Sequence, residues 1–148
     1  MGDLTKNLSR HEFACHCCGI DNISLRQVEA VQKLRDLADG PVKIISGCRC
    51  PLHNLATGGE AHSEHITTKI TQGSASDVVF SPRMSLAKMY TLALLVKEFK
   101  NGGIGLYPQA DPPFMHVDSR GHPARWGKVD GEYCSLETAL RKAQELEV

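Results

Sequence analysis

The segment Phe114-Met115-His116-Val117-Asp118 constrains the fold more than any other part of this chain. Its alternation predicts a strand, and a strand places His116 and Asp118 on the same face. His65 lies in a polar segment, and Asp77 stands at the start of an apolar run. Two histidines and a carboxylate from three segments match an open Zn²⁺ site, which takes three protein ligands and leaves one position for water. If they converge, the chain is a metal-dependent hydrolase.

Each of these residues also has an ordinary structural interpretation, which the sequence leaves open. His116 and Asp118 would equally fit a solvated surface strand. Asp77 needs a partner beside its apolar run, and a helix cap or an arginine would serve as well as zinc. His65 would equally fit an exposed loop.

Hydrophobic periodicity and turn residues predict a mixture of helices and strands. Strands are predicted at 42–46, 75–80, 104–107 and 114–118. Helices are predicted from Ser24 to 38, from Ser85 to about 99 and over 137–145, with short helices after Ser9 and within 48–59. Ser9 and Ser24 each have a Glu or Gln three residues later, the spacing of a capping box. Strands and helices do not alternate strictly, so we predict an α+β fold, a small antiparallel sheet that carries the zinc cleft and is flanked by helices.

Length and charge bound the remaining possibilities. The chain has 148 residues without a repeat or a long linker, so residues 1–148 are predicted to be one domain, and we expect a monomer. Lys+Arg and Asp+Glu both number 17, which gives no reason to expect a nucleic-acid partner. We expect no membrane span, because no apolar run approaches about 18 residues. The N-terminus lacks a signal region, so we expect synthesis in the cytoplasm.

One arginine occupies a sharp turn after a predicted strand. Arg49 lies in Ser46-Gly47-Cys48-Arg49-Cys50-Pro51-Leu52-His53-Asn54. A guanidinium is a rigid fork that suits a carboxylate or a developing oxyanion. A structural ion pair would also explain it.

Five of the six cysteines fall in two clusters, around positions 15–18 and 48–50. In a reducing compartment such clusters favour metal or free thiols over disulfides. Cys15, Cys17 or Cys18, Cys48 and Cys50 are candidates for a second, closed zinc site, although Cys-x-Cys pairs are tight for one tetrahedron. Cys134 is isolated and is expected to be a buried small apolar residue.

Five motifs in one order resemble the zinc D-alanyl-D-alanine peptidases, which are related to lysostaphin-type enzymes and the hedgehog domain. They are Ser-Gly-x-Arg-x-Pro-x-x-Asn at 46–54, Gly-Gly at 58–59, Ser-x-His at 63–65, Gly-x-Ala-x-Asp at 73–77 and Phe-x-His-x-Asp at 114–118. Glu-Phe-Ala-Cys-x-Cys-Cys-Gly at 12–19 and Ala-Arg-Trp-Gly at 124–127 resemble the branch found in phage and bacterial cell-wall hydrolases. Each motif is short, but five in the right order are specific.

The resemblance implies roles for individual residues. It implies that His65, Asp77 and His116 bind the catalytic zinc, and that Arg49 binds the substrate carboxylate or the transition-state oxyanion. It also implies a carboxylate general base near the last ligand. Asp118 is our choice for this base because it shares a strand face with His116; the alternatives are Asp111 and Glu64.

The implied activity is zinc-dependent hydrolysis of D-Ala-D-Ala or related bonds in peptidoglycan stem peptides. The enzyme would act on the cell wall after release or separate export. A second possibility is an L-alanyl-D-glutamate or crosslink endopeptidase of endolysin type. A third is a non-catalytic module that binds the cell wall or forms part of a phage structure, because fold does not fix function.

The chain departs from the family pattern between its first two implied ligands. The pattern His-x-x-Gly-x-Ala-x-Asp is shorter than the segment from His65 to Asp77, so Ile66 to Gln72 contains an insertion. A surface loop tolerates such an insertion. It would also be able to displace His65, to make His62 the ligand, or to form a lip over the cleft. A displaced His65 would favour the non-catalytic module.

Overall fold

The computed structural model describes residues 2–147 and contains one six-stranded sheet. Its order is β1-β2-β4-β3-β5-β6. The strands are β1 (Val42–Ser46), β2 (Ala75–Phe80), β3 (Gly103–Tyr107), β4 (Phe114–Asp118), β5 (Ala124–Val129) and β6 (Glu132–Cys134). The helices are the 3-10 turn η1 (Arg10–Phe13), α1 (Leu25–Ala38), α2 (Pro51–Ala56), α3 (Leu86–Ala93), α4 (Lys97–Lys100) and α5 (Leu136–Leu146).

The α+β class is confirmed, but the prediction of an antiparallel sheet is wrong in one place. Strands β3 and β5 pair in parallel, whereas the other neighbouring strands are antiparallel. After β4 the chain passes β3 and joins its free edge, where the backbone N–H of Ala124 donates to the carbonyl of Gly102. Strands β5 and β6 were not predicted because their side chains are mostly half-buried or exposed and give no clear alternation.

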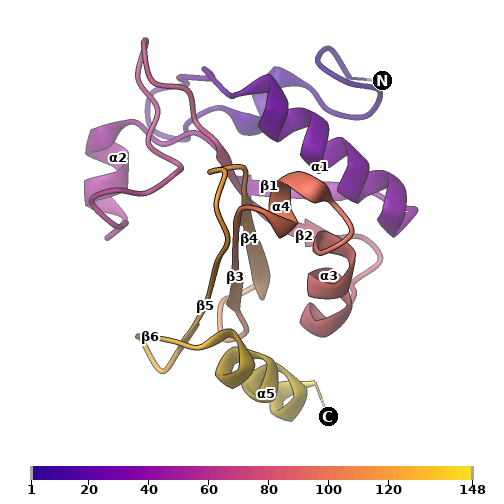
Figure 1. Cartoon of the computed structure of the whole chain (residues 1–148). Helices are drawn as coiled ribbons and strands as arrows, with labels where there is room; N and C mark the ends of the chain where they lie inside the picture. Colours follow the sequence, from indigo (N-terminus) through magenta and orange to yellow (C-terminus); the bar gives the residue numbers. More distant parts are fainter. Residues whose placement is uncertain (1, 148) are drawn as a thin grey trace.

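The helices cover the sheet unequally. Figure 1 shows α1, α3 and α4 on one side of the sheet, α2 on the other side, and α5 beside the end formed by β5 and β6. The largest side chains of the core lie between these layers, among them Phe13, Leu34, Phe99, Ile104 and Met115, each with no measurable exposure. Burial of this apolar area is the main stabilising contribution to the fold.

The predicted helix over 85–99 is interrupted, which corrects that prediction. Helix α3 ends at Ala93 and α4 begins after Val96, whose backbone is extended. Val96 and Phe99 are both buried, whereas Leu95 is 66% exposed. The break therefore directs Val96 and Phe99 into the core. In one continuous helix these two side chains would point in other directions.

Serine caps begin α1, α3 and α5, and one predicted capping box is only half formed. Ser24 Oγ accepts the backbone N–H of Gln27, as expected for an N-cap. The Gln27 side chain does not return to Ser24. It is fully buried and donates to Ser76 Oγ and to the carbonyl of Val117. By contrast, the Glu12 side chain does accept the N–H of Ser9. Gln27 thus joins α1 to β2 and β4.

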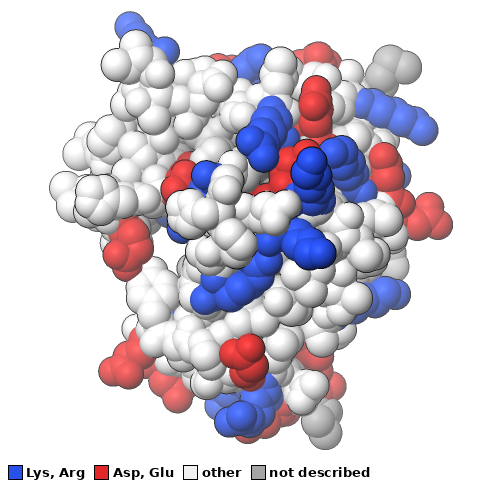
Figure 2. Space-filling view, viewed as in Figure 1, with Lys and Arg blue, Asp and Glu red and all other residues white. Residues whose placement is uncertain are grey.

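Two surface properties bear on partners. Within residues 2–147, no helix combines the length and the apolar character needed to cross a bilayer. Figure 2 shows Lys and Arg interspersed with Asp and Glu over the face that it presents, while the area over α2 is mostly uncharged.

Candidate metal centre

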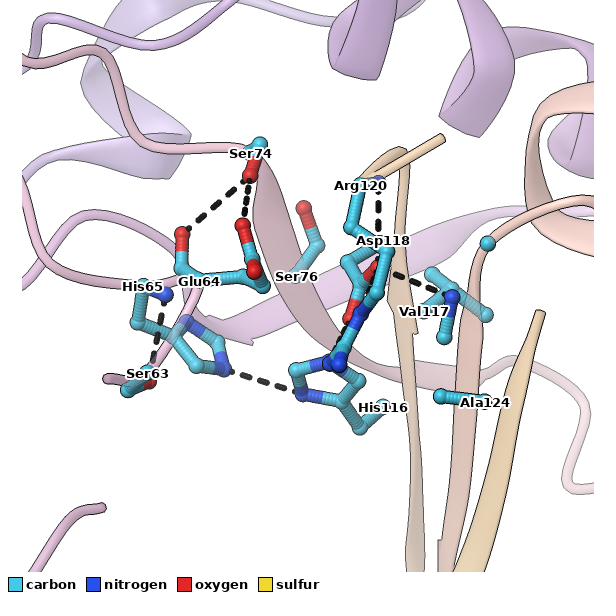
Figure 3. A network of polar contacts seen from close by, with 12 residues as sticks. Ser63, Glu64, His65, Ser74, Ser76, His116, Val117, Asp118, Arg120 and Ala124 are labelled. Atoms are coloured by element: carbon cyan, nitrogen blue, oxygen red, sulfur yellow. Dashed lines mark hydrogen bonds and ion pairs between the residues drawn. The ribbon is translucent and has the colours of Figure 1, made fainter. Parts of the chain in front are cut away.

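Three segments bring His65, Asp77 and His116 together. Asp77 on β2 is the direct partner of His116 on β4, so the two side chains share a face of the sheet. His65 precedes β2 and is fixed against the Arg49 turn, because its carbonyl accepts the N–H of Arg49 at 2.8 Å. His65 Nε2 lies 3.1 Å from Asp77 Oδ1 and 3.2 Å from His116 Nδ1, and Figure 3 shows the two rings facing each other.

The hydrogen bonds on the outer side of each ring fix its tautomer. His65 Nδ1 is 2.7 Å from the carbonyl of Gly47, which can only accept, so Nδ1 carries the proton. His116 Nε2 is 2.7 Å from Asp118 Oδ2 and donates to it in the same way. In the neutral rings, two nitrogen lone pairs therefore face Asp77 Oδ1. Three acceptors that converge in this way suit a cation, and two imidazoles with one carboxylate suit Zn²⁺.

Electrostatics favour positive charge at this group, whether it is carried by a proton or by a metal ion. Burial alone would raise the pKa of Asp77, but the neighbouring histidines hold it well below its usual range. Burial would lower the pKa of His116, but its bonds to Asp118 and Asp77 raise it to about 9. For His65, burial dominates and lowers the pKa. Asp77 is therefore ionised, and a proton on His116 competes with a metal ion.

Arg49 lies beside the group and contacts the other oxygen of Asp77. Its Nη2 is 3.2 Å from Asp77 Oδ2, its Nε donates to Ser46 Oγ, and its Nη1 donates to Asn54 Oδ1. The side chain also lines the cleft. Three of the five guanidinium N–H groups are thus engaged, and two are available to a ligand.

Asp118 is not placed as a general base would be. It is fully buried and lies behind His116. Its oxygens accept from the guanidinium of Arg120 and from the backbone N–H of Gly103. These bonds, with His116, hold the pKa of Asp118 well below its usual range despite burial. In this geometry Asp118 contacts the outer nitrogen of His116 and not the side that faces Asp77.

A cleft of about 560 Å³ opens over the His65–Asp77–His116 group. Its walls include two positive side chains, Arg120 and Lys128, and four aromatic residues, Tyr107, Phe114, Trp126 and Tyr133. Trp126 lies 4.9 Å from the His116 ring between centroids, and its Nε1 donates to the hydroxyl of Tyr107. An added Cβ at Gly105 would meet the Trp126 ring at 2.5 Å, so this strand position must be small. A cavity of this volume is within the range of small-molecule binding sites.

A family model described as Peptidase M15 matches residues 6–118, which include the whole His65–Asp77–His116 group. The chain belongs to the M15 peptidase family. This family consists of zinc-dependent peptidases, so the predicted resemblance is confirmed at that level. No curated protein matches the chain.

The insertion does not separate His65 from Asp77 and His116. His65 is 2% exposed and faces Asp77, whereas His62 is exposed on the cleft wall and is not part of the group. The backbone N–H of Thr67 donates to the carbonyl of Arg49, and the tip of the loop at Ile70 is 94% exposed. The extra residues therefore extend outward from a fixed base.

The other predicted base candidates lie in different places. Glu64 lines the cleft, and its Oε2 accepts from Ser74 Oγ at 2.9 Å, as Figure 3 shows. Asp111 is exposed in the turn between β3 and β4 and is not among the cleft residues.

The cysteines form a group that differs from the predicted set. Cys15, Cys18 and Cys50 lie together, whereas Cys48 is buried on the side of Gly73 and Cys17 is exposed next to Cys50. Burial would raise the pKa of the Cys15 thiol, but backbone N–H groups of the two cysteine segments lower it to about 7. Cys134 is half-buried on β6.

Sequence reasoning did not assign several residues of this M15 site. Arg120 donates two hydrogen bonds to Asp118 and lies 5.3 Å from the Trp126 ring centroid. Its position two residues after Asp118 was the available signal, because alternation places both on one side of an extended segment. Tyr133 and Lys128 come from the unpredicted strands β5 and β6, so no signal pointed to them.

Proposed function

We propose that this M15 peptidase hydrolyses D-Ala-D-Ala or related bonds in peptidoglycan stem peptides, with Zn²⁺ held by His65, Asp77 and His116. The observation that supports this most is the convergence of these three donors, with fixed tautomers, beneath an open cleft. When bound, Zn²⁺ lowers the pKa of a coordinated water to about 7 and polarises a carbonyl. The family relationship supports the zinc and the peptidase chemistry.

Arg49 is proposed to bind the peptide. Its two unused N–H groups are available to the terminal carboxylate or to the oxyanion that develops at the scissile carbonyl. Asp77 Oδ2 and Ser46 Oγ hold the guanidinium, so it is oriented before the substrate arrives. Such orientation avoids an entropic cost at the moment of reaction.

The proton acceptor is proposed to be one of two glutamates in the cleft. Glu60 and Glu64 both line it, and Glu64 adjoins His65. Asp118, our choice from the sequence, accepts four hydrogen bonds within the protein and one from His116, which leaves it without access to the cleft. We therefore propose Asp118 as a positioning residue.

The cleft walls fit a peptide with small side chains and free carboxylates. Arg49, Arg120 and Lys128 supply positive charge around the metal ligands, and Trp126 and Tyr107 form a flat wall near His116. Because β5 and β6 supply part of this wall, we propose that residues 1–148 act as a single peptidase domain. We also propose that the protein is a monomer. Peptidoglycan would be reached after release or separate export.

Activity on defined peptides tests the proposal. The purified protein with added zinc is incubated with a stem pentapeptide that ends in D-Ala-D-Ala, and products are identified by mass spectrometry. We expect release of the terminal D-Ala, and no release by His116→Ala. Cleavage between L-Ala and D-Glu would instead assign the endopeptidase specificity. If neither the pentapeptide nor crosslinked fragments are cut, a non-catalytic wall-binding module is the better interpretation.

A further inference from the structure

A second group of metal-binding side chains lies outside the cleft, where the loop after η1 meets the Arg49 turn. The sulfur atoms of Cys15, Cys18 and Cys50 lie within 4.8 Å of one another. We propose that these three thiolates bind a structural Zn²⁺, separate from the metal centre of the cleft. Sulfur ligands favour Zn²⁺ over the harder divalent cations, and Zn²⁺ prefers tetrahedral sites rich in cysteine.

The turn that carries Cys15 and Cys18 has a fixed backbone. The N–H of Cys15 donates to the carbonyl of Ile20 at 2.8 Å, and the N–H of Gly19 donates to the carbonyl of Cys15 at 2.8 Å. Gly19, directly after Cys18, has φ +78°, a conformation that glycine adopts at little cost. A Cys-x-x-Cys-Gly turn closed in this way holds both sulfurs toward Cys50 before any ion binds.

Backbone donors are directed at two of the sulfurs. The N–H of Cys50 donates to Cys15 Sγ at 3.5 Å, and the N–H of His53 donates to Cys50 Sγ at 3.3 Å. Such bonds stabilise the negative charge of a thiolate, the form that binds metal. A cysteine that serves only as a small apolar residue has no need of them, and Cys134 is placed in that way, against Gly127.

The composition of the site differs from the set that spacing suggested. Cys48 is 2% exposed and points toward Gly73, so it takes no part. Of the two alternatives that the sequence left open, Cys17 and Cys18, it is Cys18 that belongs to the group of three. Cys17 is exposed and lies beside Cys50, whose thiol raises the pKa of Cys17, so it is a candidate for the fourth position.

The proposed ion would join two distant segments next to a cleft residue. Cys15 and Cys50 are 35 positions apart, and Arg49 immediately precedes Cys50. The backbone N–H of Cys48 also donates to the carbonyl of Phe13, so the same two segments already touch. Metal binding to ligands that converge only in the folded chain contributes directly to folding. The site would therefore stabilise the turn that positions Arg49.

Cobalt substitution of the full chain tests this inference. The protein is stripped of metal under reducing conditions and loaded with Co²⁺, and both the bound metal per chain and the absorption spectrum are measured. Sulfur ligands give an intense thiolate-to-cobalt charge-transfer band, which the nitrogen and oxygen donors of the cleft do not give. We expect two ions per wild-type chain and this band. His116→Ala should lose one ion and keep the band.

The cysteine variants make the assignment specific. Cys50→Ser should lose one ion and the band, whereas the matched control Cys134→Ser should keep both. Any of three results would overturn the proposal. The first is a wild-type chain that lacks the charge-transfer band, and the second is a single bound ion that disappears in His116→Ala. The third is a disulfide among Cys15, Cys18 and Cys50 in protein that was loaded with zinc under reducing conditions. The wild-type spectrum decides the matter even if Cys50→Ser does not fold. The charge-transfer band comes from the thiolates alone, so failure of this inference is distinguishable from failure of the proposed function: one ion with the band would leave the cysteine site standing and count against the cleft metal.

Discussion

At the scale of single residues, the site depends on which ring nitrogen of each histidine is hydrogen-bonded to the protein. Gly47 and Asp118 hold the outer nitrogens of His65 and His116, so that the inner nitrogens face Asp77. A carboxylate such as Asp118, which is not itself a proposed metal ligand, can still affect metal affinity, because it fixes the tautomer and the orientation of the His116 ring.

Asp118→Asn separates a positioning role from a base. The substitution keeps the size but removes the charge that accepts from His116 and Arg120. We expect zinc affinity to fall by about 10- to 100-fold, and hydrolysis to recover when zinc is raised to saturation. Zinc titration and turnover at saturating zinc measure the two effects, with Glu64→Gln as the control that should keep zinc affinity. Unchanged zinc affinity with a loss of about 10²-fold in saturated turnover would instead restore Asp118 as the base.

Arg49→Lys tests whether the guanidinium fork matters beyond its charge. Lysine keeps the charge but cannot contact Ser46 and Asp77 while leaving two N–H groups free. Turnover should fall at least about 10-fold, on the order of 1.4 kcal/mol in the barrier. Arg125→Lys is the matched control, because Arg125 donates only to main-chain carbonyls, those of Lys100, Gly102 and Ala124. Equal kinetics in both variants would make Arg49 structural.

At the scale of elements, the sequence predicts strands when their residues alternate between apolar and polar or form an apolar run. It also predicts the order of these helices and strands along the chain. The strands of Asp77 and His116 were predicted, but their pairing was not, because it joins segments 39 positions apart. Strands β5 and β6 were not predictable, because a parallel edge pairing with half-buried side chains has no local signature. The same limit applies to Asp118. Alternation correctly placed it on the face of His116, but its burial and the five hydrogen bonds that it accepts, one of them from His116, are properties of the assembled sheet.

Gln27 on α1 connects the helix layer to the two strands that carry the ligands. Its amide donates to β2 at Ser76 and to β4 at Val117, from a fully buried position. Gln27→Ala should lower the free energy of unfolding by about 2–3 kcal/mol, through a cavity and two lost hydrogen bonds. Urea denaturation measures this, and exposed Glu29→Ala on the same helix should change stability by less than about 0.5 kcal/mol. Equal effects in the two variants would contradict the bridging role.

At the scale of the whole molecule, we expect metal binding and folding to be coupled. The three proposed ligands lie on segments separated by 12 and 39 positions and meet only when the sheet has formed. The family match ends at residue 118, yet β5 and β6 supply Trp126, Lys128 and Tyr133 to the cleft. The C-terminal third of the sheet is therefore part of the site.

Chelation should lower the melting temperature of the whole chain, and part of this decrease should depend on His116. An ion at 100 to 1,000 times its Kd stabilises the native state by about 2.7–4.1 kcal/mol, if the unfolded chain does not bind it. For a chain of this size, about 2–4 °C accompanies each kcal/mol, so the cleft ion should account for roughly 5–16 °C. The shift between zinc-loaded and chelated protein is measured by calorimetry in the wild type, His116→Ala and Cys50→Ser. His116→Ala should lose the part due to the cleft, and any shift that it retains should disappear when Cys50→Ser is added. If His116→Ala shows the full wild-type shift, the cleft group does not bind the ion.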